Sequence, residues 1–206
     1  MRRVALLALT ASFLATPAAV AAPGAIDFVV TEDKHTVNDA SFTSRAAIVR
    51  MIGRTNKISG DAHMLLSDMA KSSGTVNVDL TSVDTGISMR NQHMRGFLET
   101  DKFPQAIFTF TGIKLDGNKL EAGKLVVGTA TGAITIHGVT KALSTPIELT
   151  YLPQGDPKYR AGDWIHFYSQ FKTKVSDFNI ALPLPMIGQK LANDLTIEID
   201  GMARAK

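Results

Sequence analysis

The sequence of 206 residues contains no cysteine. It can therefore form no disulfide, supplies no thiolate ligand to a metal and lacks the C-x-x-C-H motif that attaches a c-type haem. A domain without disulfides must be stabilised by its core, and a chain of this length can bury a core that is large enough. The length also suits a single domain.

A strong net charge and catalytic sequence motifs are absent as well. With 22 basic and 19 acidic residues the formal net charge is +3, and no cluster of lysine and arginine predicts a nucleic-acid partner. None of the five histidines has the H-x3-H or H-E-x-x-H spacing of a zinc site. No G-x-S-x-G string and no spacing typical of a Ser/His/Asp triad is present. The sequence therefore predicts no metal site, no catalytic residues and a protein that is not an enzyme.

The one long apolar run lies at the start of the sequence. Arg2 and Arg3 precede an apolar stretch from Val4 to Leu14, and Ala19-Val20-Ala21 supplies a small-x-small cleavage pattern. A membrane span needs about 20 apolar residues, which is more than this stretch offers. We therefore expect residues 1–21 to be a signal peptide and residues 22–206 to be one exported domain in the periplasm.

Alternation of apolar and polar residues dominates the remaining sequence. Val76, Val78 and Leu80 share one face of an extended segment, for example, while polar residues occupy the other. A short helix is predicted from Ser88 to Leu98, with Ser88 as its N-cap. The pattern predicts an antiparallel all-β protein and leaves a barrel and a sandwich open. The expected strands lie near residues 26–30, 36–50, 56–68, 75–81, 106–115, 123–136, 147–151, 164–175 and 195–200.

Four sequence blocks carry a resemblance to a known family. They are TG-x3-R-x2-H at 85–93, DKFP at 101–104, TIHGVTK at 135–141 and SDFNI at 176–180. In their order and spacing they resemble the YceI-like family of polyisoprenoid-binding, lipocalin-like periplasmic proteins, from about Ile26 to Ala203. Where the family usually has Asp-Phe-Gly-Ile, this sequence reads Asp177-Phe178-Asn179-Ile180.

The resemblance implies an eight-stranded antiparallel lipocalin-like barrel with one short helix near residues 88–98. A barrel of this size can hold one slender ligand, which the resemblance identifies as a long-chain polyisoprenoid or a similar amphiphilic lipid such as an isoprenoid quinone. No other cofactor is expected. A transient membrane contact and a homodimer both stay open. The apolar faces that would line the lumen contain Phe108, Phe110, Ile134, Ile136, Ile165, Phe167 and Phe171.

The polar end of the ligand is expected near the helix. Its candidate contacts at the barrel rim are Arg90, His93, Arg95, Asp177 and Phe178. Arginine can bind an anionic headgroup through two parallel hydrogen bonds. The alternative is that Arg90 or Arg95 pairs with Asp84, Glu99 or Asp177 and fixes the helix to the barrel.

Two further motifs have both a structural and a functional interpretation. His137 precedes Gly138 in a tight turn, where it can brace the turn or contact the ligand. The segment 181–188 is apolar and contains two prolines, so it can close a barrel end or contact the ligand or a membrane. For the whole protein, the alternatives to a lipid carrier are a small stress-response interaction protein with a filled core and an enzyme that acts on a hydrophobic substrate.

Overall fold

The structure is a computed structural model that describes residues 24–31, 38–117, 120–154, 161–183, 188 and 190–206. These residues contain one α-helix, α1 (Ser88–Leu98), and three short 3-10 helices, η1 (Met69–Lys71), η2 (Leu80–Ser82) and η3 (Val175–Phe178). The signal peptide expected at residues 1–21 lies outside them. The strands are β1 (Ile26–Val30), β2 (Asp39–Arg45), β3 (Arg50–Thr55), β4 (Ile58–Met64), β5 (Ser73–Asp79), β6 (Gln105–Leu115), β7 (Leu125–Ile136), β8 (Val139–Leu152), β9 (Trp164–Lys174) and β10 (Asp194–Ala205).

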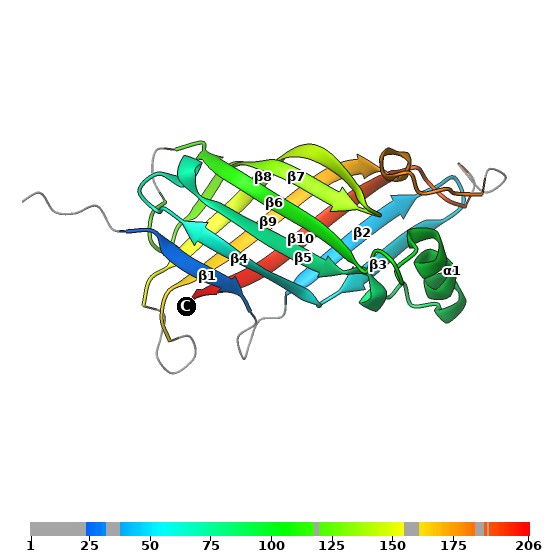
Figure 1. The fold of residues 1–206 in the computed structure, drawn as a ribbon, viewed down its shortest axis with the longest axis horizontal. Coiled ribbons are helices and arrows are strands. Elements are labelled where there is room, and N and C mark those ends of the chain that lie inside the picture. The colour runs from blue at the N-terminus through cyan, green and yellow to red at the C-terminus, as the bar shows by residue number, and fades with distance from the viewer. Residues whose placement is uncertain (1–23, 32–37, 118–119, 155–160, 184–187, 189) are drawn as a thin grey trace, which may run out of the picture.

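The strands form one closed, antiparallel sheet. From β4 to β10 each strand pairs with the next one in the sequence, and β1 pairs with both β4 and β10. Residue Phe28 of β1 lies opposite Ala205 of β10, so pairing between the two ends of the described chain closes the ring. Figure 1 shows the resulting elongated barrel, with α1 at one end. The sandwich that the alternation left open is therefore excluded.

The ten strands make up eight positions around the barrel. Strands β1 and β2 pair with successive parts of β10, at residues 203–205 and 195–200. On their other side, β1 pairs with β4 and β2 pairs with β3. Strands β3 and β4 are likewise consecutive in the chain. Each of these two positions is thus one long strand with an interruption, which confirms the eight-stranded barrel expected from the resemblance.

Two predicted strands extend well beyond the strands observed. The strand expected at 36–50 ends at Arg45, and the chain turns at 46–49 before β3 begins. The Ala46 N–H donates to the Val49 carbonyl oxygen at 2.9 Å, which closes this turn. No glycine, proline, asparagine or aspartate occurs between 45 and 50 to signal it. The strand expected at 56–68 runs only from Ile58 to Met64.

The barrel end opposite α1 is closed by a hydrophobic cluster. Phe28, Met64, Ile113 and Leu149 are at most 3% exposed, and η1 contributes Met69 to the same cluster. Side chains from seven strands therefore fill this end. A second cluster, around Val175, Phe178 and Ile180 after β9, lies toward the α1 end.

The helix was predicted with its observed bounds, although its cap differs from the prediction. Ile87, rather than Ser88, is the N-cap residue, and its side chain makes no capping hydrogen bond. The Asn91 side chain instead accepts from the Thr85 N–H at 2.8 Å, which fixes the chain just before the helix. Among the described residues, no helix has the length and apolar character needed to cross a membrane.

Candidate ligand-binding cavity

A cavity of about 700 Å³ extends through the barrel from the closed end toward α1. Ligand pockets in proteins are typically about 300–1,000 Å³. Its walls are mostly apolar side chains that alternate with outward-facing polar residues along the strands. The cavity floor includes Phe28, Met64 and Leu149 of the closed-end cluster. The barrel interior is therefore an apolar compartment with a closed floor.

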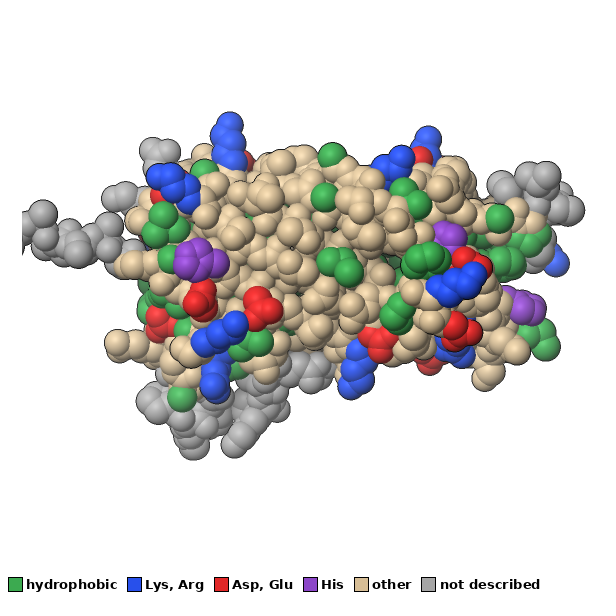
Figure 2. Space-filling model, in the orientation of Figure 1, with side chains coloured by type: hydrophobic (Ala, Val, Ile, Leu, Met, Phe, Trp, Pro, Cys, Tyr) green, Lys and Arg blue, Asp and Glu red, His purple; other side chains and the backbone are tan. Residues whose placement is uncertain are grey.

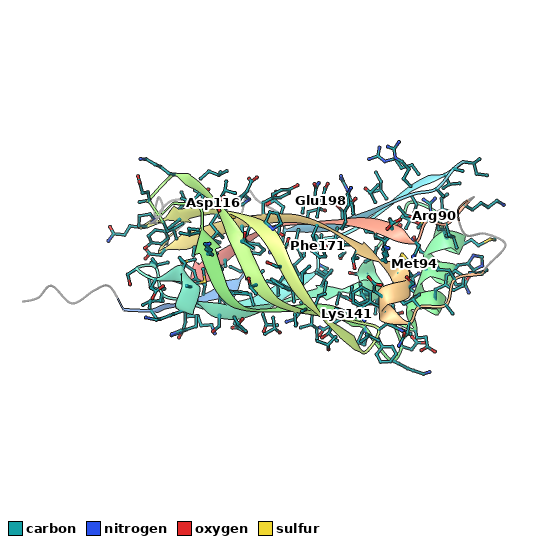
Figure 3. All side chains as sticks on the ribbon, turned by 90° about the horizontal axis from the view of Figure 1, so that it is seen from above. Arg90, Met94, Asp116, Lys141, Phe171 and Glu198 are labelled. Carbon is teal, nitrogen blue, oxygen red and sulfur yellow. The ribbon has the colours of Figure 1, made fainter. Side chains whose placement is uncertain are left out.

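All seven side chains predicted to face the lumen line this cavity, namely Phe108, Phe110, Ile134, Ile136, Ile165, Phe167 and Phe171. Phe108 and Phe110 stack with ring centroids 6.4 Å apart. Figure 3 shows Phe171 in the middle of the barrel, between Asp116 at one end and Arg90 and Met94 at the other. That these residues contact a lipid stays a prediction.

Three cavity-lining phenylalanines lie directly against glycines on the neighbouring strand. Phe167 is the register partner of Gly201, Phe42 of Gly53 and Phe110 of Gly74. A Cβ atom added at Gly201 would lie 2.5 Å from the Phe167 ring, and one at Gly53 would lie 2.3 Å from the Phe42 ring. The rings are therefore packed against the barrel wall over residues without side chains, which keeps the lumen open.

The prediction missed part of the apolar lining. Ile197 and Ile199 of β10 and Val76 and Val78 of β5 also face the cavity. The same alternation that identified the seven predicted residues would have found these four. Met94 and Phe97 on α1 complete the lining at the open end, and their spacing on a short amphipathic helix was a weaker signal.

Helix geometry separates the rim residues that were predicted together. Arg90, His93, Met94 and Phe97 recur at three- and four-residue spacing, so they share one helix face, and all four line the cavity. Arg95 lies about 140° around the helix from Arg90 at 3.6 residues per turn. It does not line the cavity, and its Nη1 donates instead to the Thr81 carbonyl oxygen at 3.1 Å.

Of the two predicted rim residues after β9, one lines the cavity. Phe178 is 2% exposed and forms part of the wall. Asp177 is exposed and does not line the cavity. Asn179 follows in the left-handed conformation with φ 55°, which glycine adopts freely and asparagine tolerates best among other residues. The asparagine can therefore keep the backbone conformation where the family usually has glycine.

The ion pair that the sequence left open for Arg90 or Arg95 is not formed, and both side chains make hydrogen bonds instead. Arg90 Nε donates to Thr85 Oγ1 at 2.9 Å, and its Nη2 donates to the Thr85 carbonyl oxygen. Among the described side chains, neither Arg90 nor Arg95 forms an ion pair with Asp84, Glu99 or Asp177. Arg90 thus stabilises the turn before α1 and also lines the cavity.

Two further cations reach the cavity at the open end. Lys174 ends β9, Lys190 lies two residues after Gly188, and both are exposed and line the same cavity as Arg90 and His93. Among the described residues, Asp61 is the one acidic residue that lines the cavity, and its carboxylate accepts from Lys206 Nζ at 2.7 Å. The two lysines were missed because they lie at strand and loop ends, where alternation carries no information.

His137 braces the open end of the barrel, as its structural interpretation predicted. Its Nδ1 lies 3.1 Å from the Phe178 carbonyl oxygen, and its Nε2 lies 3.1 Å from Glu99 Oε2. The Phe103 ring packs edge-on against it with a centroid separation of 4.7 Å. The β7–β8 turn, the C-cap of α1 and η3 are thus joined through one imidazole. His166 is only partly exposed and contacts Asp200 on β10 at 2.7 Å.

The contact between Glu99 and His137 predicts an acid-sensitive contribution to stability. Hydrogen bonds from Lys102 and then His137 lower the pKa of Glu99. A carboxylate with a lowered pKa stabilises the fold above its unfolded-state pKa, and this stabilisation is lost as the pH falls through the folded-state pKa. The wild-type protein should therefore have a higher melting temperature than Glu99→Gln at pH 7, and this difference should shrink as the pH falls from about 5 to about 3. Thermal melts of both proteins across this pH range test the prediction. A difference in melting temperature that does not change with pH would contradict it.

A larger ring at Phe167 is expected to obstruct the cavity. Because the Phe167 ring already lies against Gly201, the additional ring of Phe167→Trp must extend into the lumen. Overpacking costs about 1–3 kcal/mol, so the variant should fold and hold severalfold less ligand. Tyr168→Trp, on the outward face of the same strand, is the matched control. Ligand extracted from both purified variants is the measurement, and equal amounts would contradict the prediction.

Comparisons with known proteins agree with this architecture. The profile of the YceI-like domain matches residues 28–203. The chain belongs to the YceI-like family. The Protein YceI sequences of Escherichia coli O157:H7 and Shigella flexneri are each 37% identical to it over 129 residues. This alignment covers 62% of the chain and 61% of each relative.

Solved structures share the fold of this YceI-like barrel. BcnA of Burkholderia cenocepacia superposes with a TM-score of 0.64 at 22% identity, over 80% of this chain and 95% of BcnA. A polyisoprenoid-binding domain from Saccharophagus degradans gives 0.66 at 18% identity, over 88% and 99% of the two chains. The YceI protein of Campylobacter jejuni gives 0.59 at 23% identity, over 75% and 84%.

The described residues of the YceI-like barrel contain no group of three or more histidine, aspartate or glutamate side chains placed to hold a metal ion. Their described buried side chains also leave no nitrogen or oxygen atom without a hydrogen-bond partner. The site is therefore characterised by an apolar cavity with cations at one end.

Proposed function

We propose that this protein binds one long-chain amphiphilic lipid, with its apolar chain inside the barrel and its polar end beside α1, and carries it in the periplasm. The ligand class is a polyisoprenoid or a similar lipid such as an isoprenoid quinone. The observation that carries the proposal is the apolar cavity of about 700 Å³. The polyisoprenoid-binding domain among the structural neighbours supports the same ligand class.

The dimensions and chemistry of the cavity favour a lipid chain. Burying a CH₂ group contributes about 0.8 kcal/mol. Ten buried carbons therefore offer about 8 kcal/mol before the cost of ordering the chain, which is subtracted from this gain. Phe171, Ile197 and Ile199 offer no polar partner, and the nearby hydroxyls of Ser169 and Thr145 already bond to each other at 2.9 Å. Burying a polar group there would therefore cost it hydrogen bonds to water.

The charge distribution gives the ligand a direction. Arg90, His93, Lys174 and Lys190 reach the cavity at its open end, and the floor is formed by Phe28, Met64 and Leu149. A lipid is therefore most stable with its apolar end on the floor and a polar or anionic group among the cations. The open lumen also counts against the alternative of an interaction protein with a filled core. Family membership and the structural neighbours favour a binding protein over an enzyme.

The proposal is tested with native protein purified from the periplasmic fraction. N-terminal sequencing is expected to begin at Ala22, which would support export and cleavage after Ala21. Mass spectrometry of the organic extract is expected to show about one isoprenoid-type lipid per protein chain. An unprocessed N-terminus would contradict the location, and a protein without extractable lipid would contradict the carrier function.

Arg90→Ala separates a headgroup contact from a purely structural role. If Arg90 faces an anionic headgroup, the variant should bind an isoprenyl pyrophosphate about tenfold more weakly, or about 1.4 kcal/mol. The wild-type affinity should also fall as the salt concentration rises, because salt screens charges beyond a Debye length of about 8 Å at physiological ionic strength. Thr85→Val is the matched control, because it removes the Thr85 hydroxyl bonded to Arg90 and keeps the cation. Titration calorimetry measures both, and unchanged affinity in Arg90→Ala would exclude the contact.

A further inference from the structure

The open end of the barrel exposes large apolar side chains to solvent. Ile48 at the tip of the β2–β3 turn is 71% exposed, and Ile87 and Met89 at the start of α1 are 53% and 68% exposed. The Ala47 N–H donates to the Gly188 carbonyl oxygen at 3.0 Å, so the β2–β3 turn lies beside the segment that follows η3. We call residues 45–50, 87–93, 188 and 190 the open rim.

The open rim is also basic. Arg45 and Arg50 flank Ile48 in the β2–β3 turn, Arg90 follows Met89, and Lys190 lies in the third segment. None of the open-rim residues is acidic. Figure 2 shows basic and hydrophobic side chains together at this end of the molecule, with some acidic side chains among them.

The acidic groups just before and just after α1 are already engaged in contacts. The Asp84 carboxylate accepts from the Gly86 N–H and from Asn91 Nδ2, and Glu99 contacts Lys102 and His137. Both therefore face partners within the protein. Asp177 and Asp194 lie outside the open rim and are exposed.

The apolar surface of the open rim continues into the cavity. Ile87 and Met89 are exposed and also line the cavity wall, as does Val49 beside Ile48. An apolar chain could therefore move from outside into the lumen along apolar contacts. The other strongly exposed apolar side chains, Leu125 and Val127, lie on the outer surface of β7 near the closed end and do not line the cavity.

We propose that the open rim docks on an anionic lipid bilayer, with Ile48, Ile87 and Met89 inserted among the lipids and the surrounding cations at the headgroups. Apolar side chains in the interface combined with basic residues above it are the two features that hold a protein at an anionic membrane surface. Docking in this orientation places the cavity opening against the bilayer. The inference goes beyond the proposed function, because it concerns where the cavity opens and not what the cavity holds.

The test is co-sedimentation of the purified protein with vesicles of phosphatidylcholine containing about 30% phosphatidylglycerol. Each basic residue near an anionic surface strengthens the attraction, and salt screens it. The wild-type protein should therefore bind these vesicles. Its partitioning should be at least tenfold weaker onto vesicles of pure phosphatidylcholine, and also at least tenfold weaker onto the anionic vesicles in high salt. The double variant Ile48→Glu/Met89→Glu should lose at least tenfold in partitioning onto the anionic vesicles.

The double variant Leu125→Glu/Val127→Glu is the matched control, because it introduces the same two charges at exposed apolar residues near the closed end. It should partition like wild type. Wild type that stays in the supernatant, or a loss in this control equal to that of Ile48→Glu/Met89→Glu, would overturn the proposal. The vesicles contain no isoprenoid, so this result is independent of the lipid content that tests the carrier function.

Discussion

Phe178→Ala is expected to lower the free energy of unfolding by about 3–5 kcal/mol, the usual cost of truncating a buried phenylalanine to alanine. The Phe178 side chain is 2% exposed and packs with Val175, Ile180 and Ile134 near the open end. Its loss leaves a cavity that the surrounding strands cannot fill, because β7 is held in register by β6 and β8. Urea unfolding followed by tryptophan fluorescence measures the change.

Leu125→Ala is the control for this truncation. Leu125 is 59% exposed on β7, so its replacement should change the free energy of unfolding by less than about 0.5 kcal/mol. A cost below about 1 kcal/mol for Phe178→Ala would show that the open end is not packed as described.

Ile197→Asp is expected to reduce bound lipid at least about 100-fold at pH 7. Ile197 lines the middle of the lumen, between its register partners Phe171 and Phe42. A carboxylate there must lose its water when an apolar chain enters, which costs several kcal/mol without a partner. Because 1.4 kcal/mol is a factor of ten, a penalty of about 3 kcal/mol suffices for this loss. Lipid per protein chain, measured by mass spectrometry after extraction, is the readout.

Two variants on the same strand control for effects on folding. Thr196→Asp places the same charge on the outward face of β10 and should keep the bound lipid. Ile197→Val keeps an apolar side chain in the lumen and should also bind normally. If Ile197→Asp folds and retains wild-type lipid content, the lipid does not occupy the middle of the barrel.

The fold was predictable from the sequence where alternation is strong. In β10, Leu195, Ile197 and Ile199 all face the lumen, as their spacing predicts. The first half of β8 was not identified, because Lys141 and Pro146 interrupt its pattern. The break between β2 and β3 was missed because apolar residues without a turn signal form it. Barrel closure was not visible in the strand pattern, since pairing between β1 and β10 depends on residues far apart in the chain; it came from the family resemblance.

The sequence predicted the residues that form the walls of the cavity better than the residues at its open end. A strand pattern states which side chains share a face, so the seven predicted lumen residues all line the cavity. It cannot state which charged side chains meet from different elements. Lys174, Lys190 and Arg90 come together only when β9, the segment after η3 and α1 assemble. Arg95 was grouped with Arg90 by closeness in sequence, although the helix turns the two apart.

Closure of the ring by β1 and β10 has a consequence for biosynthesis. The ribosome makes β10 after every other strand of the barrel, and the Phe28–Ala205 pairing that joins the two ends must wait for it. Until then β9, β2 and β1 each have an unpaired edge, and the apolar lumen faces are open to water. Such edges and faces are where nascent chains aggregate. Chaperone protection should therefore matter most in the interval before β10 emerges.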